Sequence, residues 1–289
     1  MVSGSGMARL TARAVHALDR IFPRVRVGGR GSREAYSEWE YREGKELVSR
    51  YAEHFGPLEG MSVLDVGCGM GGKTVAYADE GAKAIGLDIS REHVAAAVRF
   101  AGSRGGRALF LVGDASSLPF RDESFGFVVA NDSMEHFSEP ASALADLSRI
   151  LAPGGKLLLF FTPWRSPLGS HLYDYIKMPW CHLLLNERVI EEVLRIVLEE
   201  RGEQDPASGA RALMDEYRSE LNRITIGRYR RIVRNRPELE TLYERLLPPK
   251  FEALGFLTRL PAVGEFFTGT VIALLRKSGG DEVPERHSS

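Results

Sequence analysis

Residues 67–74 are the stretch whose residue types and spacing most clearly indicate ligand chemistry. They read Gly-Cys-Gly-Met-Gly-Gly-Lys-Thr and follow the apolar run at 63–66. The final Gly-Lys-Thr completes the P-loop pattern that binds polyphosphate, whereas the spacing of the glycines also fits the dinucleotide-binding pattern. In both patterns a strand enters a tight glycine turn, so that backbone approaches the ligand before a helix begins.

Asp65 bears on the charge of that ligand. It lies two residues before the first glycine, where a polyphosphate would bring negative charge close to the carboxylate. With Asp65 included, the segment Val-Leu-Asp-Val-Gly-Cys-Gly resembles the first motif of class I S-adenosylmethionine-dependent methyltransferases. S-adenosylmethionine carries an α-ammonium and a sulfonium group, which an acid attracts directly or through water.

Two further apolar runs end in acids. The run at 84–87 leads into Asp88, where a Rossmann-type site places the carboxylate that bonds ribose hydroxyls, and this feature suits NAD and S-adenosylmethionine equally. The run at 109–113 leads into Asp114 and is followed by Leu-Pro-Phe at 118–120. The resemblance implies that Asp114 accepts a hydrogen bond from the adenine amino group, and the Leu-Pro-Phe is common in the small-molecule, type 11-like branch of the family.

The segments 125–137 and 151–161 extend the resemblance. The first reads as a strand followed by Ser-Met-Glu-His-Phe, which is similar to the fourth motif of that branch, although a P-loop protein would use such a strand as its Walker B strand. The second carries Pro-Gly-Gly before an apolar run, which indicates a turn and a fifth strand. The resemblance implies an α/β fold, a Rossmann-like seven-stranded mostly parallel sheet with helices on both faces, an antiparallel last strand and a helical cap insertion.

The resemblance also implies S-adenosyl-L-methionine as the cofactor and a set of cofactor-binding residues at the glycine turn and the strand ends. These are Asp65, Gly67, Cys68, Gly69, Asp88, Ile89, Asp114, Ala115 and Asn131. Three alternatives stay open at this point. They are a P-loop protein, an NAD-binding protein, and a methyltransferase-fold binder or cyclase that transfers no methyl group.

Histidines are the candidate catalytic residues. A methyl group on a sulfonium is already activated, so holding donor and acceptor in line contributes more to the rate than a base does. His136 follows the fourth strand, where the family places acceptor-side residues, and His171 is a second candidate with Asp174 and His182. His136 could equally cap the next helix or pack on the cofactor. No short ligand spacing joins these residues, so no metal site is predicted.

The segment 131–134 indicates the kind of acceptor. Nucleic-acid amino methyltransferases usually show Asn/Asp-Pro-Pro-Tyr/Phe there, whereas this chain has Asn-Asp-Ser-Met. The formal net charge of −1 over 289 residues provides no overall field that would attract a nucleic-acid backbone. We therefore expect a small-molecule acceptor, methylated at an oxygen or carbon nucleophile, and no nucleic-acid partner.

Length and composition predict five segments. Residues 1–6 have the composition of a flexible extension and are left out of the fold prediction. The number and spacing of the two cysteines indicate no disulfide or zinc framework, which favours a reducing, cytoplasmic setting. No apolar run is long enough for stable insertion into a membrane. The segments are an N-terminal extension and helix at 1–34, a cofactor-binding core at 35–162, a helical cap for the acceptor at 163–250, the C-terminal part of the core at 251–277 and a flexible tail at 278–289.

Within the cap, apolar spacing of three and four residues predicts an amphipathic helix over 186–202. Further helices are expected at 207–224 and 227–247, followed by a last core helix at 251–256 and a closing strand at 269–275. The aromatic and histidine side chains of 164–182 are expected either to line an acceptor pocket or to form the packing core of the cap.

Two other segments have alternative interpretations. The five arginines within 228–236 could bind an anionic acceptor, a carrier-protein phosphopantetheine or a membrane surface, but acids nearby favour a solvated helix face. The segment 35–55 reads as a helix, and the resemblance implies that such a helix closes over the cofactor. One of its aromatic residues Tyr36, Trp39 and Tyr41 is expected near the methionine end.

Overall fold

The computed structural model describes residues 4–23, 32–249, 252–261 and 263–279. The chain divides into two compact units. The first unit contains residues 1–27, 162–226 and 246–270, and the second contains residues 28–161, 227–245 and 271–289. This division places 227–245 with the core rather than with the predicted cap, and it places 1–27 with most of the cap segment.

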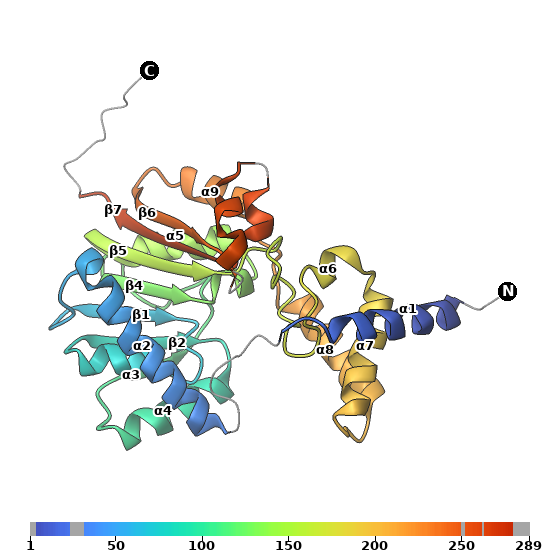
Figure 1. Ribbon diagram of the computed structural model, residues 1–289. Coiled ribbons are helices and arrows are strands. Elements are labelled where there is room, and N and C mark those ends of the chain that lie inside the picture. The colour runs from blue at the N-terminus through green and yellow to red at the C-terminus, as the bar shows by residue number, and fades with distance from the viewer. Residues whose placement is uncertain (1–3, 24–31, 250–251, 262, 280–289) are drawn as a thin grey trace. The chain divides into compact units, whose positions relative to one another are not determined.

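The second unit is built on a seven-stranded sheet with the strand order β3-β2-β1-β4-β5-β7-β6 (Figure 1). Strands β1 and β4 in its centre are almost entirely buried, as expected where helices cover both faces of a parallel sheet. The strands are β1 (Ser62–Val66), β2 (Lys83–Asp88), β3 (Leu109–Val112), β4 (Phe125–Asn131), β5 (Leu151–Phe161), β6 (Leu239–Leu247) and β7 (Thr270–Lys277).

The first five strands are parallel, and β7 runs antiparallel to β5. The Pro-Gly-Gly segment is accommodated inside β5, where the register with β4 jumps from Leu151 opposite Phe125 to Lys156 opposite Phe127. The predicted Rossmann-like sheet with an antiparallel last strand is therefore confirmed. Its parallel order brings the carboxyl ends of β1 to β4 to one edge, where ligands of open α/β sheets bind.

Helices connect these strands. The helix predicted over 35–55 is confirmed as α2, and Ser32 caps it by accepting a hydrogen bond from the Ala35 amide at 3.2 Å. The helices of this unit are α2 (Arg33–Phe55), α3 (Gly72–Asp79), α4 (Arg91–Ser103), the short 3₁₀ helix η1 (Met134–His136), α5 (Pro140–Ile150) and α9 (Ile226–Arg234).

The single helix predicted over 227–247 is wrong in its second half. Helix α9 ends at Arg234, and β6 begins at Leu239 and lies at the edge of the sheet beside β7. Pro237 between them has no amide hydrogen to continue a helix. Arg276 of β7 donates to Glu240 of β6 at 2.6 Å, a cross-strand pair that the sequence did not reveal.

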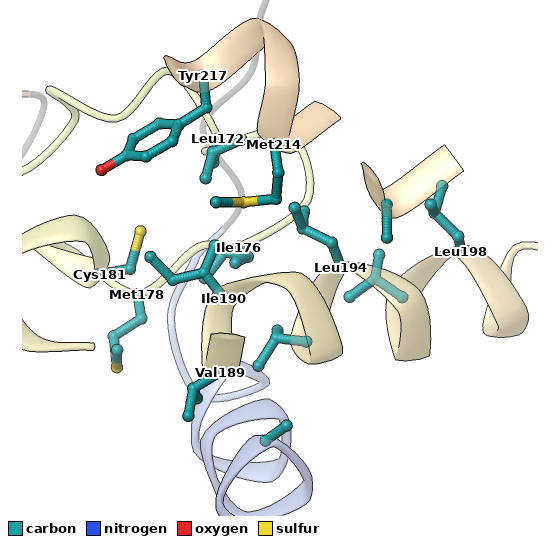
Figure 2. Packing of buried hydrophobic residues seen from close by; sticks show 14 of the residues in the cluster. Leu172, Ile176, Met178, Cys181, Val189, Ile190, Leu194, Leu198, Met214 and Tyr217 are labelled. Atoms are coloured by element: carbon teal, nitrogen blue, oxygen red, sulfur yellow. The ribbon is translucent and has the colours of Figure 1, made fainter. Parts of the chain in front are cut away.

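The first unit is helical and has its own core (Figure 2). Helix α7 provides six buried residues of that core from one face, as its apolar spacing predicted, and Asn186 caps it by accepting a hydrogen bond from the Val189 amide at 3.0 Å. Helix α1 packs on α7 in this unit. The helices are α1 (Gly4–Asp19), α6 (Cys181–Leu184), α7 (Glu187–Glu200), α8 (Pro206–Ser219) and the 3₁₀ helices η2 (Glu252–Arg259) and η3 (Gly264–Phe267).

Two boundary predictions in this unit are wrong. Helix α1 begins at Gly4, inside the segment set aside as an extension, because glycine only lowers helix propensity by about 1 kcal/mol and does not forbid a helix. The expected core helix at 251–256 is the 3₁₀ helix η2, which belongs to the first unit. Position 251 itself lies outside the described residues, as do residues 1–3 of the extension and residues 280–289 of the predicted tail.

Helix α2 lies directly on the glycine turn that joins β1 to α3. A β-carbon added to Gly72 would lie 2.1 Å from the carbonyl oxygen of Ser37 and 2.5 Å from the β-carbon of Glu40. Only glycine allows this approach. The glycine is thus required by helix packing as well as by any ligand.

Gly72→Ala should therefore destabilise the chain by roughly 1 to 3 kcal/mol, because α2 or the turn must move. Urea unfolding followed by circular dichroism measures this loss. The matched control is Gly102→Ala in α4, where an added β-carbon meets no atom within 4 Å. That control should be neutral or stabilising, and equal losses in both variants would contradict the close packing of α2.

Candidate cofactor site

The glycine turn has the strand–turn–helix geometry that a nucleotide-type ligand requires. Gly67, Gly69 and Gly71 adopt positive φ angles of 72°, 54° and 82° between the end of β1 and the start of α3. Side chains rarely adopt these angles, and a β-carbon would also meet Ser133 at Gly67, Glu40 at Gly69 and Ala97 at Gly71. Cys68 in the same turn is buried.

Asp65 lies in β1, just before this turn, and its carboxylate is buried and bonded within the protein. It is buried in β1, and its Oδ2 accepts a hydrogen bond from Thr74 Oγ1 at 2.6 Å. Burial raises the pKa of Asp65 to about 6, although the Thr74 bond and nearby Lys73 oppose the shift. The Thr74 hydroxyl is completely buried, so it is not available to hold a metal ion beside a polyphosphate as a P-loop requires.

Asp88 ends β2 and holds the turn from the other side. Its Oδ2 accepts from the Gly69 amide and its Oδ1 from the Ser90 amide, both at 2.9 Å. Burial raises the pKa of Asp88, but hydrogen bonds from His93 and from these two amides outweigh burial and lower it below its usual value. A carboxylate that stays ionised at the end of the second strand is suited to bond ribose hydroxyls.

Glu40 is the residue that sequence reasoning missed. It lies on α2, only 4% exposed, and its Oε2 accepts from the Gly72 amide at 3.3 Å while its Oε1 lies 2.9 Å from where a β-carbon of Gly69 would be. Burial raises the pKa of Glu40 to about 7, against the opposing effects of Lys73 and the Gly72 amide. In the sequence, Glu40 is one of several acids on the predicted helix 35–55, between the aromatic residues Trp39 and Tyr41. Its position gives no sign that it would be buried against the glycine turn.

The aromatics of α2 have other contacts. The Tyr41 hydroxyl donates to Asp79 at 2.8 Å, and the Arg104 guanidinium lies 4.0 Å from the centre of the Tyr41 ring. Tyr36 and Trp39 lie against each other with ring centres 5.3 Å apart. Helix α2 contacts the glycine turn through Glu40 and through Ser37, whose hydroxyl donates to the Met70 carbonyl at 3.2 Å.

The remaining predicted cofactor residues lie at neighbouring strand ends. Ile89 is exposed directly after β2, and Asp114 is exposed after β3, where its Oδ1 accepts from the Ser116 amide at 2.8 Å. Ala115 is buried beside it, and Asn131 ends β4. Because β3, β2, β1 and β4 are adjacent and parallel, these positions share one edge of the sheet with the glycine turn. Their roles toward the cofactor remain predictions.

The candidate catalytic residues divide between the units. His136 is exposed at the end of η1 in the second unit, and His171 lies in the first unit with a positive φ of 57°. His182 is nearly buried in the first unit, where its Nε2 bonds the Trp164 carbonyl at 2.7 Å and burial lowers its pKa. His182 therefore has a packing role in its unit.

The aromatics of 164–182 also contribute to packing. Trp164 lies against His182, with ring centres 4.6 Å apart, and Trp180 donates to the Phe266 carbonyl at 2.9 Å. Leu172 and Ile176 of the same segment are buried in the core of the first unit (Figure 2). Part of this segment is therefore the packing core of the unit.

Comparison with known proteins places this geometry in a family. Residues 64–159, which run from Leu64 in β1 to Leu159 in β5, match the family described as a methyltransferase domain. Among similar proteins, a demethylmenaquinone methyltransferase of Renibacterium salmoninarum is 35% identical over 42% of this chain and 50% of its own length. An uncharacterized methyltransferase of Mycolicibacterium gilvum is 29% identical over 75% of this chain and 76% of its own length.

A solved structure shows the same fold at low identity. The cyclase SpnF is 19% identical, with a TM-score of 0.53 over 96% of this chain and 97% of its own. The match to the demethylmenaquinone methyltransferase, by contrast, spans half of that relative's length.

The fold and the matched domain define a class I, Rossmann-like methyltransferase. Residues 64–159 form a methyltransferase domain similar to the type 11-like branch of the S-adenosylmethionine-dependent enzymes, and the cofactor that this domain implies is S-adenosylmethionine. The donor set fits this cofactor because Asp88 stays ionised and a sulfonium or an α-ammonium would favour the ionised forms of Glu40 and Asp65, whereas a polyphosphate would oppose them.

Glu40→Gln should change how stability depends on pH. Because the pKa of Glu40 is raised from 4.5 to about 7, the folded chain keeps a proton that the unfolded chain releases between these values, and stability falls as pH rises through that window. The variant removes this loss, so it should be more stable than wild type by roughly 2 to 3 kcal/mol at about pH 8 and nearly equal at about pH 4.

Urea unfolding at both pH values, without cofactor, measures this difference. Glu43→Gln is the matched control, since Glu43 lies on the exposed side of the same helix and should give no pH-dependent gain. A Glu40→Gln variant that is less stable than wild type at high pH would show that Glu40 is ionised and stabilising in the folded chain.

Proposed function

We propose that the chain transfers the methyl group of S-adenosylmethionine to an oxygen or carbon nucleophile of a small molecule. The observation that carries this proposal is the convergence of Glu40, Asp65 and Asp88 on the glycine turn, because ionised acids favour a cationic cofactor. The Asn-Asp-Ser-Met segment after β4 lacks the Pro-Pro of nucleic-acid amino methyltransferases and supports a small acceptor.

The protein's part in this reaction is mainly positioning. Bound cofactor supplies a methyl group already activated by its sulfonium. Asp88 would hold the ribose, and the glycine turn would hold the methionine part, so that the methyl group faces the acceptor at the carboxyl edge of β4 and β5. Holding two reactants in line contributes up to about 7 to 11 kcal/mol.

His136 is the base we propose for an acceptor that must lose a proton. It is exposed just beyond β4, and an imidazole is the commonest group for this task. We propose His171 as the second candidate. The part of the predicted cap that lies in the first unit, residues 163–226, would provide the acceptor site, although its packing core occupies part of the aromatic run.

Similarity supports the acceptor class only broadly. The Renibacterium relative acts, by its name, on a demethylmenaquinone, which is a small organic acceptor. The net charge of −1 supports a partner other than nucleic acid, and two buried free cysteines support a reducing, cytoplasmic setting. The cyclase SpnF shares the fold alone, so methyl transfer itself must be measured.

Transfer of labelled methyl from S-adenosylmethionine to compounds of a metabolite extract is the direct test. A labelled small molecule is the expected result. Binding of S-adenosylhomocysteine without any labelled product from extracts or from purified nucleic acid would favour a cofactor-binding protein or a cyclase instead.

Asp88→Asn should weaken cofactor binding by roughly ten- to a hundredfold, because a charge-assisted pair of hydrogen bonds to the ribose is lost. Calorimetric titration with S-adenosylhomocysteine measures the dissociation constant. Asp122→Asn is the matched control, since that carboxylate is exposed and pairs with Arg149. Unchanged affinity in Asp88→Asn would remove Asp88 from the cofactor site.

His136→Ala should lower the rate of methyl transfer and leave the dissociation constant of the cofactor nearly unchanged, which is the opposite of the effect expected for Asp88→Asn. Loss of a general base lowers the rate at saturating cofactor by about 10² to 10⁴ while the dissociation constant stays nearly the same. Single-turnover transfer measures the rate once an acceptor is known. A variant that loses only cofactor affinity would show that His136 is a neighbour of the cofactor, and His171→Ala is then the next variant to measure.

A further inference from the structure

Helix α1 presents three different faces along its length. One face is buried in the first unit, where Ala12 is completely covered and Val15 packs against the hydrophobic core. Asp19 on this face is also buried, and its Oδ1 accepts from the Met178 amide at 2.6 Å. The apolar packing of α1 on its unit is therefore provided by this face.

A second face is apolar and exposed. Met7, Leu10 and Leu18 are 58%, 61% and 49% exposed, and Ile21 in the turn that follows the helix is 72% exposed. Steps of three, eight and three residues return to the same side of a helix with 3.6 residues per turn. The four side chains thus form one apolar stripe, a feature that a helix of a globular unit does not need for its own core.

A third face, beside the stripe, carries arginines. Arg9, Arg13 and Arg20 follow at steps of four and seven residues, which again return to one side. Arg9 and Arg20 lie 3.7 and 2.8 Å from acids of α7 and remain about two-thirds exposed, whereas Arg13 makes no ion pair among the residues that the structure describes.

The charge of the N-terminal segment is opposite to that of the rest of the chain. Residues 1–33 contain seven arginines and a single acid, Asp19, although the whole chain has a formal net charge of −1. Asp19 is buried, with Lys177 Nζ at 3.8 Å, so it does not offset the arginines at the surface. On α1 and directly after it, the three exposed arginines therefore outnumber the one buried acid, although Arg9 and Arg20 are each paired with an acid of α7.

We propose that the exposed faces of α1 dock the protein on an anionic membrane surface. The apolar stripe would enter the boundary between headgroups and acyl chains, and the arginines beside it would contact lipid phosphates, which is the arrangement of interfacial helices. Within the described part of the chain no helix is long and apolar enough to span a bilayer. The apolar stripe could also bind a second copy of the chain. The charge of the neighbouring face favours lipid, because two copies joined through their stripes would bring the arginines of both close together.

Co-sedimentation with vesicles tests the proposal without any methyl transfer, so it is independent of the proposed function. The full chain should bind vesicles of phosphatidylcholine mixed with phosphatidylglycerol, bind pure phosphatidylcholine much more weakly, and dissociate as salt is raised. Leu10→Glu and Arg13→Glu should each lower the partition constant by about tenfold or more.

Matched controls separate the surface of α1 from a general effect of charge. Val98→Glu changes a side chain that is 53% exposed on α4, and Arg211→Glu changes an exposed arginine on α8. Both should leave vesicle binding nearly unchanged. Circular dichroism should show all four variants folded, since each replaces an exposed side chain.

Three results would overturn the proposal. One is the absence of binding to the mixed vesicles, and another is equal loss of binding in the control variants. The third is a chain that self-associates in solution and that Leu10→Glu alone converts to a monomer, because the stripe would then be an interface between copies. Sedimentation of each variant without lipid measures this last outcome.

Discussion

The contact between α2 and the glycine turn is the constraint on which the cofactor site depends. The carbonyl of Ser37 and the side chain of Glu40 occupy the space where a β-carbon of residue 72 would lie, so the helix, the turn and the start of α3 must be placed together. The same contact buries an acid from outside the β1–α3 segment next to the turn. The contact between α2 and Gly72 thus both packs the helix on the turn and places the Glu40 carboxylate at the candidate cofactor site.

Charge then decides what the turn is suited to bind. Glycine turns before helices commonly receive phosphate, because backbone amides point at the ligand. Here the amides of Gly69 and Gly72 are instead bonded by Asp88 and Glu40, and Asp65 lies beneath them. A polyphosphate would meet three acids, whereas a ligand with a sulfonium and an α-ammonium would favour their ionised forms.

The sequence predicted the sheet and the glycine turn well because local patterns determine them. Short, mainly apolar runs that end near Val66, Asp88 and Asn131 are characteristic of buried parallel strands. The structure has β1, β2 and β4 at these places. The edge strand β6 was read as a helix because its alternation is weak and follows an arginine-rich helix, and the pairing beside β7 is a long-range contact. Glu40 was missed for the same reason, since nothing in its own segment shows that it reaches the turn.

Counting the protons released on cofactor binding tests the central claim most directly. Calorimetry at a pH between about 6 and about 7, the raised pKa values of Asp65 and Glu40, in two buffers of different ionisation enthalpy gives this number. If positive charge on the cofactor ionises these acids, S-adenosylmethionine should release a substantial fraction of a proton, and S-adenosylhomocysteine, which lacks the sulfonium charge, should release less. Proton uptake with S-adenosylmethionine, or tight binding of ATP in its place, would contradict the account.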